Sequence, residues 1–167
     1  MFEIGKINAQ DKREFYKQLN TYLIGLINEE TDWLAGIANA SALLYQLLPD
    51  INWAGFYLYK DGELVLGPFQ GKPACVRIAL GKGVCGTAAK TRKIQVVEDV
   101  NQFPGHIACD ASSQSEIVLP IIKNDKLIGV LDIDSPVKAR FNKQDVEGLS
   151  SFVNILNQYI NWPEQFD

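Results

Sequence analysis

Two turn dipeptides, each between two apolar runs, constrain the fold of this sequence more than any other feature. Asp61-Gly62 separates an aromatic run over residues 51–60 from a second run over 63–69, and Asn124-Asp125 separates runs over 116–122 and 127–134. Dipeptides of this kind close β-hairpins, whose two strands are antiparallel. Because one hairpin lies near the start of the strand series and the other at its end, the sequence predicts an antiparallel sheet.

Segments with the apolar spacing of helices precede and follow the predicted strands. Short strands are also predicted over 76–80 and 94–97. The order helix, helix, about six strands and helix predicts an α+β architecture with helices on one side of the sheet. The predicted helices are 10–29, one from Thr31 as N-cap to Pro49, a short one from a glycine loop to about Thr91, and one that begins after Asn142.

The length and charge of the chain fit a single domain over residues 1–167. The net charge of −4 gives no basic field that would attract nucleic acid or an anionic membrane surface. Residues 1–19 are rich in charge and lack the apolar core of a signal peptide, and no apolar run is long enough to cross a bilayer. These features predict a cytoplasmic protein without nucleic-acid or membrane partners.

The three cysteines, Cys75, Cys85 and Cys109, lie on predicted loops or at the edges of elements. None forms a Cys-x-x-Cys pair, and an odd number does not suit a fixed disulfide framework. Cys85 is expected at the start of the short helix, where the helix dipole lowers the pKa of a thiol. Cys109 lies in a long polar loop over 101–115, and loops of that length are commonly functional or disordered. These positions favour redox chemistry over the alternative of three small buried residues.

Two further patterns have simpler interpretations. Gly81–Gly86 satisfies Gly-x-Gly-x-x-Gly, but the helix after it is too short for a dinucleotide-binding unit, which favours a glycine-rich turn. The lone histidine, His106, could act as a base for Cys109 or could be a polar loop residue, which we favour. A metal site built from His106 and the cysteines would match no common ligand spacing, so no metal is predicted.

Acidic residues gather at the ends of the last two predicted strands. Strand alternation places Asp132 and Asp134 on one face with Ile128 and Val130, and Leu127, Leu131 and Ile133 on the other. Glu116 opens the preceding strand, just after the long loop. Two neighbouring carboxylates need a cation, a metal or a shared proton, unless they belong to a solvated strand end.

Taken together, these residues resemble the free methionine-R-sulfoxide reductases, a family of stand-alone GAF domains. The similarity runs from about Thr31 to the last helix, which implies a catalytic GAF core over 31–162 and an N-terminal helical extension over 1–30. It also implies an antiparallel sheet with terminal helices on one face and a loop-covered pocket on the other. The matching segments are Asp50–Tyr57, Leu66–Lys72, Gly83–Thr87, Gly105–Asp110, Ser115–Pro120 and Gly129–Ser135.

The resemblance implies that free methionine sulfoxide is reduced by a cysteine thiolate, without a bound cofactor or metal, in a homodimer. Cys109 would be the nucleophile, Cys75 the resolving thiol and Cys85 an auxiliary resolving thiol, with thioredoxin as external dithiol reductant. Substrate would bind between an aromatic lining and an acidic wall, in which Glu116 is an acid or a binding group. These binding residues would be Trp53, Tyr57, Glu116, Asp132 and Asp134.

Other interpretations remain open at this point. A GAF domain can be a binding module that senses a small ligand without turnover. A thiol peroxidase or a metal-held structural protein would also use cysteines on loops. These alternatives make different predictions for methionine formation, nucleotide binding, peroxide consumption and metal content.

Overall fold

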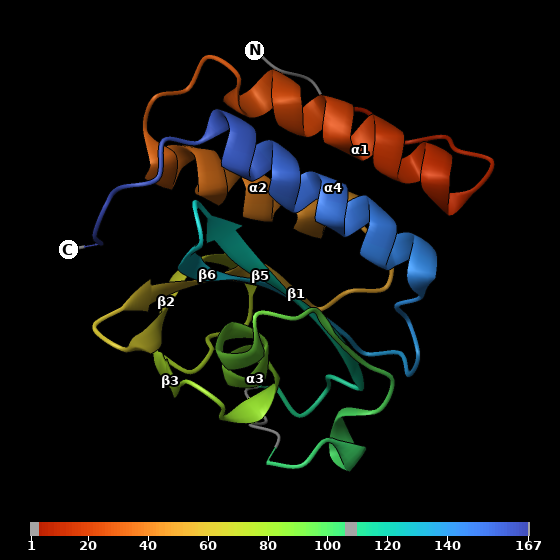
Figure 1. Ribbon diagram of the computed structural model, residues 1–167. Helices are drawn as coiled ribbons and strands as arrows, with labels where there is room; N and C mark the ends of the chain where they lie inside the picture. The colour runs from red at the N-terminus through yellow and green to blue at the C-terminus, as the bar shows by residue number, and fades with distance from the viewer. Residues whose placement is uncertain (1–3, 106–109, 167) are drawn as a thin grey trace.

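A six-stranded antiparallel sheet forms the centre of the protein in a computed structural model that describes residues 4–105 and 110–166 (Figure 1). The strand order is β3-β2-β1-β6-β5-β4, so both predicted hairpins, β1/β2 and β5/β6, are present. The strands are β1 (Trp53–Lys60), β2 (Glu63–Gly71), β3 (Arg77–Ala79), β4 (Gln95–Val97), β5 (Ser115–Lys123) and β6 (Lys126–Ser135).

The two hairpin turns have the geometry that their dipeptides favour. Asp61 and Gly62 have φ of 47° and 91°, and Asn124 and Asp125 have φ of 51° and 60°. Positive φ at both central residues matches the twist of the flanking strands, and Asn, Asp and Gly tolerate it best. The turn signals therefore predicted the antiparallel sheet correctly.

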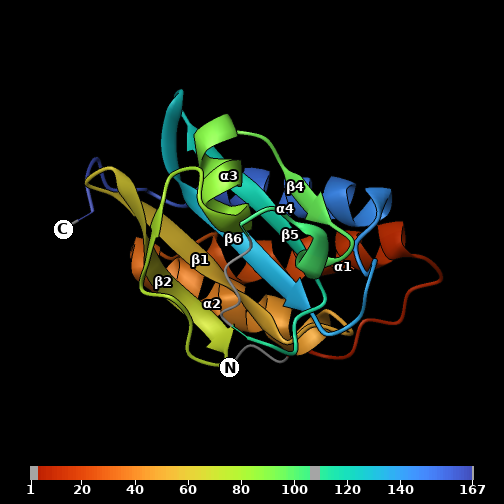
Figure 2. The same ribbon diagram turned by 90° about the horizontal axis from the view of Figure 1, so that it is seen from below.

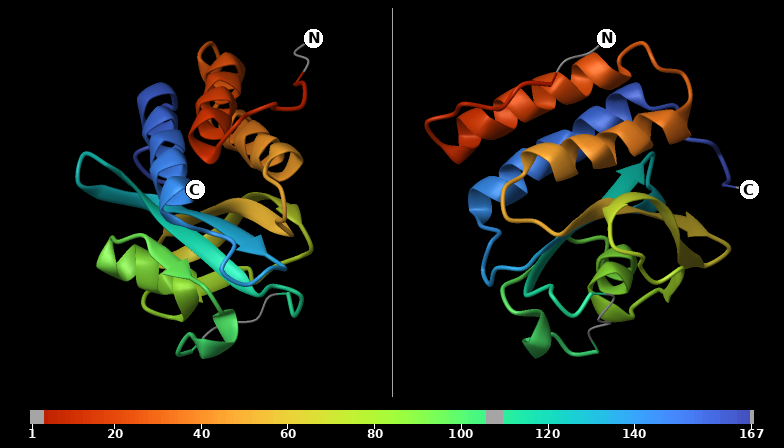
Figure 3. Two further views of the ribbon diagram at one scale, coloured as in Figure 1. Left: turned by 90° about the vertical axis from the view of Figure 1, so that its right-hand side faces the viewer. Right: turned by 180° about the vertical axis from the view of Figure 1, so that it is seen from behind.

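The terminal helices share one face of the sheet, as predicted, but the prediction that all helices lie on one side was wrong, because α3 covers the other face. α2 (Trp33–Leu47) packs on β1 and β2, α4 (Lys143–Tyr159) packs on β5, and α1 (Lys12–Ile27) lies over α2 and α4 as an outer layer (Figure 3). α3 (Gly83–Thr91) lies against β5 and β6 on the opposite face, and the short η1 (Val100–Gln102) follows β4 (Figure 2). Within the described residues, no helix has the length and apolar character needed to cross a bilayer.

Side-chain caps fix where the long helices begin. Asn142 caps α4 in a capping box with Asp145, as the sequence predicts. The prediction for α2 was wrong by one residue, because Asp32 and not Thr31 accepts the hydrogen bond from the N–H of Ala35 (2.9 Å). Asp11 caps α1 in the same way.

Apolar side chains fill both faces of the sheet and form two cores. The larger core lies between the sheet and the helix layer, and the smaller one lies under α3. Ile128 belongs to the larger core, whereas Leu127 packs against the smaller one. The sequence-based prediction had the reverse assignment for these two residues and was wrong. The reason is a β-bulge: Ile121 pairs with Gly129 and Ile122 with Leu127, which leaves Ile128 as an extra residue and reverses the alternation there.

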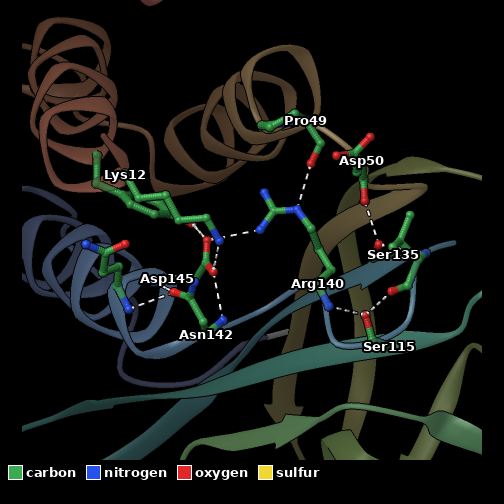
Figure 4. A network of polar contacts seen from close by, with 11 residues as sticks. Lys12, Pro49, Asp50, Ser115, Ser135, Arg140, Asn142 and Asp145 are labelled. Carbon is green, nitrogen blue, oxygen red and sulfur yellow. Dashed lines mark hydrogen bonds and ion pairs between the residues drawn. The ribbon is translucent and has the colours of Figure 1, made fainter. Parts of the chain in front are cut away.

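A buried polar network ties the helix layer to the strand ends below it (Figure 4). Asp145 is 1% exposed and accepts hydrogen bonds from Lys12 and Tyr16 of α1 and from Arg140. Burial alone would raise the pKa of Asp145, but these bonds and the backbone N–H of Asn142 bring it below its ordinary value. Arg140 makes two further hydrogen bonds. Its Nε donates to the carbonyl oxygen of Pro49, before β1 (3.0 Å). Its backbone N–H donates to Oγ of Ser115, the first residue of β5 (3.3 Å).

Candidate active site

Three adjacent strands place acidic and aromatic side chains side by side on the α3 face of the sheet. Asp134 on β6 pairs with Trp53 on β1 and with Glu116 on β5, so these residues form one row across the strands. Asp132, two residues before Asp134, points the same way and pairs with Gly55. Side chains directly opposite on neighbouring strands approach within about 5.5 Å, so the register alone brings the predicted acids together.

A cavity opens over this row, between the sheet and the N-terminal end of α3. It spans about 560 Å³, open space at its mouth included. It contains all five predicted binding residues. The described lining residues are Trp53, Tyr57, Lys72, Pro73, Ala74, Ile78, Lys82, Gly83, Val84, Cys85, Asp110, Ser113, Glu116, Asp132 and Asp134.

Stacked aromatic rings form one wall of the cavity. The Trp53 ring stacks on Tyr57 at a centroid distance of 6.0 Å and on Phe69 at 5.2 Å. Trp53 and Tyr57 are 3% and 1% exposed, and they lie on the same strand face, as their spacing predicts. Gly55 makes this stack possible, because a Cβ there would lie 2.3 Å from Phe69 Cβ and 2.7 Å from the Trp53 ring.

The acidic wall is buried, and burial changes its protonation. Burial and the charges of the neighbouring carboxylates raise the pKa of Glu116 well above its ordinary value, and the same causes raise that of Asp134. Burial raises the pKa of Asp132 less, to about 6, because hydrogen bonds with Cys85 and Glu116 favour its charged form. At neutral pH the three acids therefore hold protons between them, and Asp132 is the one that ionises most readily.

Cys85 is the third residue of α3 and lies against the acidic wall. Its Sγ is 3.9 Å from Glu116 Oε1, and the residue is 4% exposed. The expected lowering of its thiol pKa by the helix dipole was wrong: burial raises this pKa well above its ordinary value, and the charges of Asp132 and Glu116 raise it further. Desolvation and like-signed charges thus outweigh the dipole of a nine-residue helix.

A divalent cation could find ligands in the same place. Cys85, Glu116 and Asp132 each offer one donor atom, and these three atoms lie within 4.8 Å of one another; all three residues are buried. Among the described residues this is the group that fits a metal. Burial raises the pKa of each of these three groups, whereas metal ligation requires them to be deprotonated.

Of the other two predicted thiols, Cys75 lies within the described residues and Cys109 lies outside them. Cys75 is half-buried in the segment between β2 and β3, next to the lining residue Ala74, and its carbonyl oxygen accepts a hydrogen bond from the Tyr57 hydroxyl (2.9 Å). Cys109, the predicted nucleophile, and His106 lie outside the described residues. The chain is described again from Asp110, directly after Cys109.

Polar residues at the mouth of the cavity were missed by the sequence-based prediction. Lys72 Nζ pairs with Asp110 Oδ1 at 3.1 Å, and both residues line the cavity together with Ser113 and Lys82. Lys72 and Asp110 end two of the segments that carried the family resemblance. Their place in those segments was the available signal, but nothing in the sequence indicated that residues 38 positions apart would form an ion pair.

Comparison with known proteins identifies the family. The GAF domain family matches residues 40–161 of this chain. The free methionine-R-sulfoxide reductase of Escherichia coli is 57% identical over 150 residues, which cover 90% of this chain and 91% of the relative. The chain belongs to the free methionine-R-sulfoxide reductase family. A second relative in this family is the free methionine-R-sulfoxide reductase of Saccharomyces cerevisiae. It is 47% identical over 156 residues, which cover 89% of this chain and 87% of the relative.

A solved member of the free methionine-R-sulfoxide reductase family has the same fold. The X-ray structure of the Neisseria meningitidis enzyme in complex with its substrate superposes with a TM-score of 0.91 at 40% identity, and covers 95% of each chain. The GAF architecture predicted from the sequence is therefore confirmed.

Proposed function

We propose that this protein reduces free L-methionine-(R)-S-oxide to L-methionine. The observation that supports this most directly is the buried row of Glu116, Asp132 and Asp134 beside the Trp53–Tyr57 stack, in a chain of this reductase family. An acidic group suits the ammonium of a free amino acid, and flat aromatic rings suit the methyl and sulfur of the sulfoxide. A peptide-bound methionine sulfoxide has no α-ammonium to pair with the acids.

Cys109 supplies the attacking thiolate in this proposal. Its sulfur attacks the sulfoxide sulfur while the sulfoxide oxygen takes up a proton. The resulting hydroxyl then passes to the cysteine sulfur, as its bond to the methionine sulfur and the transient S–S bond both break. The products are methionine and a Cys109 sulfenic acid, so the cysteine is oxidised by two electrons and the substrate is reduced by two. The reaction needs a soft nucleophile and an acid that still holds its proton near neutral pH.

The acidic wall divides into a proton source and a cation-binding group. Glu116 and Asp134 have pKa values well above their ordinary range, so they hold protons that can pass to the sulfoxide oxygen. Asp132, whose pKa is about 6, is ionised at neutral pH and pairs with the substrate ammonium. General acid catalysis of this kind contributes roughly 10²–10⁴-fold in rate.

The oxidised enzyme is then returned to its starting state by thiol chemistry. Cys75, with Cys85 as an auxiliary thiol, condenses with the sulfenic acid to form a disulfide and releases water. Thioredoxin reduces this disulfide by exchange and is itself oxidised. No bound cofactor takes part. We place the catalytic core at residues 31–162 and propose a cytoplasmic homodimer.

A thioredoxin-coupled assay with a panel of substrates tests the proposal. We expect turnover of free methionine-R-sulfoxide and little turnover of its S epimer or its N-acetylated form, and dialysis against a chelator should not change the rate. Equal rates on the free and N-acetylated forms would contradict the role of the acidic wall. Tight nucleotide binding without turnover would favour the sensor instead.

Cysteine variants test the order of the thiol steps. Cys109→Ser is expected to abolish methionine formation, whereas Cys75→Ser is expected to give about one methionine per enzyme and then stop. Chromatographic quantification of methionine in single turnovers separates the two outcomes. Full steady-state activity in Cys109→Ser would show that another residue is the nucleophile.

A further inference from the structure

Asp110 joins separate segments of the chain at the mouth of the cavity. Its Oδ1 accepts hydrogen bonds from the backbone N–H of Ser112 (2.9 Å) and from Lys72 Nζ (3.1 Å), and its Oδ2 accepts one from Asn52 Nδ2 (3.2 Å). Asn52 directly precedes β1 and Lys72 directly follows β2. We call Asp110, Asn52 and Lys72 the Asp110 clamp, because they hold the segment before β5 against the ends of β1 and β2.

Both partners in the clamp are themselves fixed to residues of the cavity. The backbone N–H of Asn52 donates to the carbonyl oxygen of Asp134 (3.0 Å). The carbonyl oxygen of Lys72 accepts a hydrogen bond from the indole Nε1 of Trp53 (3.1 Å). The clamp is therefore tied to the acidic wall on one side and to the aromatic wall on the other.

We propose that Asp110 is a positioning residue for the reductase reaction, because the Asp110 clamp fixes the chain at the residue directly after Cys109. This inference rests on the proposed function, in which Cys109 is the nucleophile. A nucleophile on a loop loses rate when its position varies, and a misplacement of about 1 Å can cost about a hundredfold. The anchors at two strand ends hold Asp110, the residue that follows the nucleophile in the sequence.

The charge of Asp110 also acts on the acidic wall. Hydrogen bonds from Ser112 and Lys72 hold the pKa of Asp110 below its ordinary range, so it is ionised at neutral pH. Burial raises the pKa of Asp134, and the negative charges of Asp132 and Asp110 raise it further. Removal of the charge at Asp110 should therefore lower the pKa of Asp134 and let it lose its proton at lower pH.

Several other groups face the cavity and share this electrostatic environment. Besides Asp110 and Asp134, the titratable groups on its described lining are Tyr57, Lys72, Lys82, Cys85, Glu116 and Asp132. The acids exchange protons with one another, so the expected change is a shift of the pH–rate profile and not the titration of one residue. The alkaline limb of the profile reports loss of the proton that the sulfoxide oxygen needs.

Asp99 offers a matched control outside the cavity. Its carboxylate also accepts hydrogen bonds from the backbone N–H two residues further on, that of Asn101 (3.1 Å), and from a lysine, Lys138 Nζ (2.7 Å). Its side chain is 14% exposed and that of Asp110 is 11% exposed. Asp99→Asn thus removes the same kinds of contact and the same charge at a residue that does not line the cavity.

The test compares single turnovers of the pre-reduced wild type, Asp110→Asn and Asp99→Asn with free methionine-R-sulfoxide, from about pH 5 to about pH 9. We expect Asp110→Asn to lower the rate constant of methionine formation about tenfold or more, to change KM less, and to move the alkaline limb to lower pH. Asp99→Asn should stay within about twofold of the wild type and leave the limb in place.

A second variant keeps the test decisive if Asp110→Asn does not fold. The Lys72 side chain is 69% exposed, so Lys72→Met should not disturb the core. It removes one anchor and also the cation that offsets the charge of Asp110. We therefore expect a lower rate constant and an alkaline limb shifted to higher pH, the direction opposite to that for Asp110→Asn.

The outcomes separate this inference from the proposed function. If the wild type reduces the sulfoxide but Asp110→Asn matches Asp99→Asn in rate and in pH profile, Asp110 has no positioning role. The same holds if its loss of rate equals its loss of folded protein, measured by circular dichroism. With Asp110→Asn unfolded, a Lys72→Met variant that behaves as the wild type overturns the inference. Absence of sulfoxide reduction by the wild type overturns the proposed function instead.

Discussion

The buried acids of the acidic wall lower the stability of the fold, and their arrangement suits substrate binding. Glu116 and Asp134 lie directly opposite on neighbouring strands, and like charges in that position are unfavourable. Asp132 is 6% exposed, and its Oδ1 has no hydrogen-bond partner within the described structure. Such a group lowers stability when it ionises, and an incoming ammonium would supply the missing partner.

Asp132→Asn is therefore expected to stabilise the protein at neutral pH while weakening substrate binding. The folded-state pKa of Asp132 is about 6, above the ordinary 3.8, so the wild type loses stability as pH rises from about 4 to about 6. The variant should gain on the order of 1–3 kcal/mol at pH 7 and nothing at pH 4, because one pKa unit corresponds to about 1.4 kcal/mol. Urea unfolding at both pH values measures the gain.

The control for this prediction is Asp125→Asn, in the exposed turn between β5 and β6. It should leave both the pH dependence of stability and KM unchanged, while Asp132→Asn should raise KM about tenfold or more. Equal stability of Asp132→Asn and wild type at pH 7 would mean that the carboxyl is not strained by burial.

For individual residues, the sequence predicted which face of the sheet a side chain lies on better than it predicted pKa values or long-range contacts. Strand alternation placed Asp132 with Asp134 and Trp53 with Tyr57, and the structure has both pairs on the cavity face. The prediction for the pKa of the Cys85 thiol was wrong because that pKa depends on burial and on acids from two strands, which no local pattern reveals. The Asp110–Lys72 contact was missed for the same reason.

Pairs of elements in the helix layer approach each other very closely. Gly148 of α4 faces the ring of Tyr16 on α1, and a Cβ at this glycine would lie 2.1 Å from Tyr16 Cγ. Gly36 of α2 has more room, because the atom nearest to a Cβ there would be the flexible tip of Ile160, at 3.3 Å. The two glycines allow a comparison of close packing with helix propensity.

Gly148→Ala is expected to destabilise the protein, and Gly36→Ala is expected to be neutral or slightly stabilising. Overpacking costs about 1–3 kcal/mol, which outweighs the gain of about 1 kcal/mol in helix propensity when Gly is replaced by Ala. Thermal unfolding of the two variants beside the wild type measures the difference. A more stable Gly148→Ala would show that α1 can shift away from α4 without loss.

Elements were predicted well where a local signal determines them. The hairpin dipeptides require positive φ, and Asn142 provides a complete capping box, so both hairpins and the start of α4 were correct. The bulge at Ile128 was not predicted, because it arises from the pairing of β6 with β5 and has no dipeptide signature of its own. The cap of α2 was misplaced because Thr31 and Asp32 are both good capping residues.

The polar network around Asp145 connects the whole molecule, from α1 to the strand ends that carry the acids. We expect Asp145→Ala to cost about 3–5 kcal/mol, because it leaves Arg140 and Tyr16 buried without their partner. Urea unfolding measures the loss. Glu147→Ala is the control on the same helix: its ion pairs with Arg13 and Lys143 are exposed and should contribute about 0–1 kcal/mol. Similar losses in both variants would refute a central role for Asp145.

The shortness of β3 and β4 has a consequence for how copies of the chain can meet. Each outer strand has three residues, so most of β2 and β5 extends past its neighbour, and those stretches contain Pro68 and Pro120. Proline has no N–H to donate, and it blocks the addition of a foreign strand. The edges of the sheet therefore disfavour edge-to-edge joining of two copies, while α2 exposes the large apolar side chains of Leu34 and Tyr45.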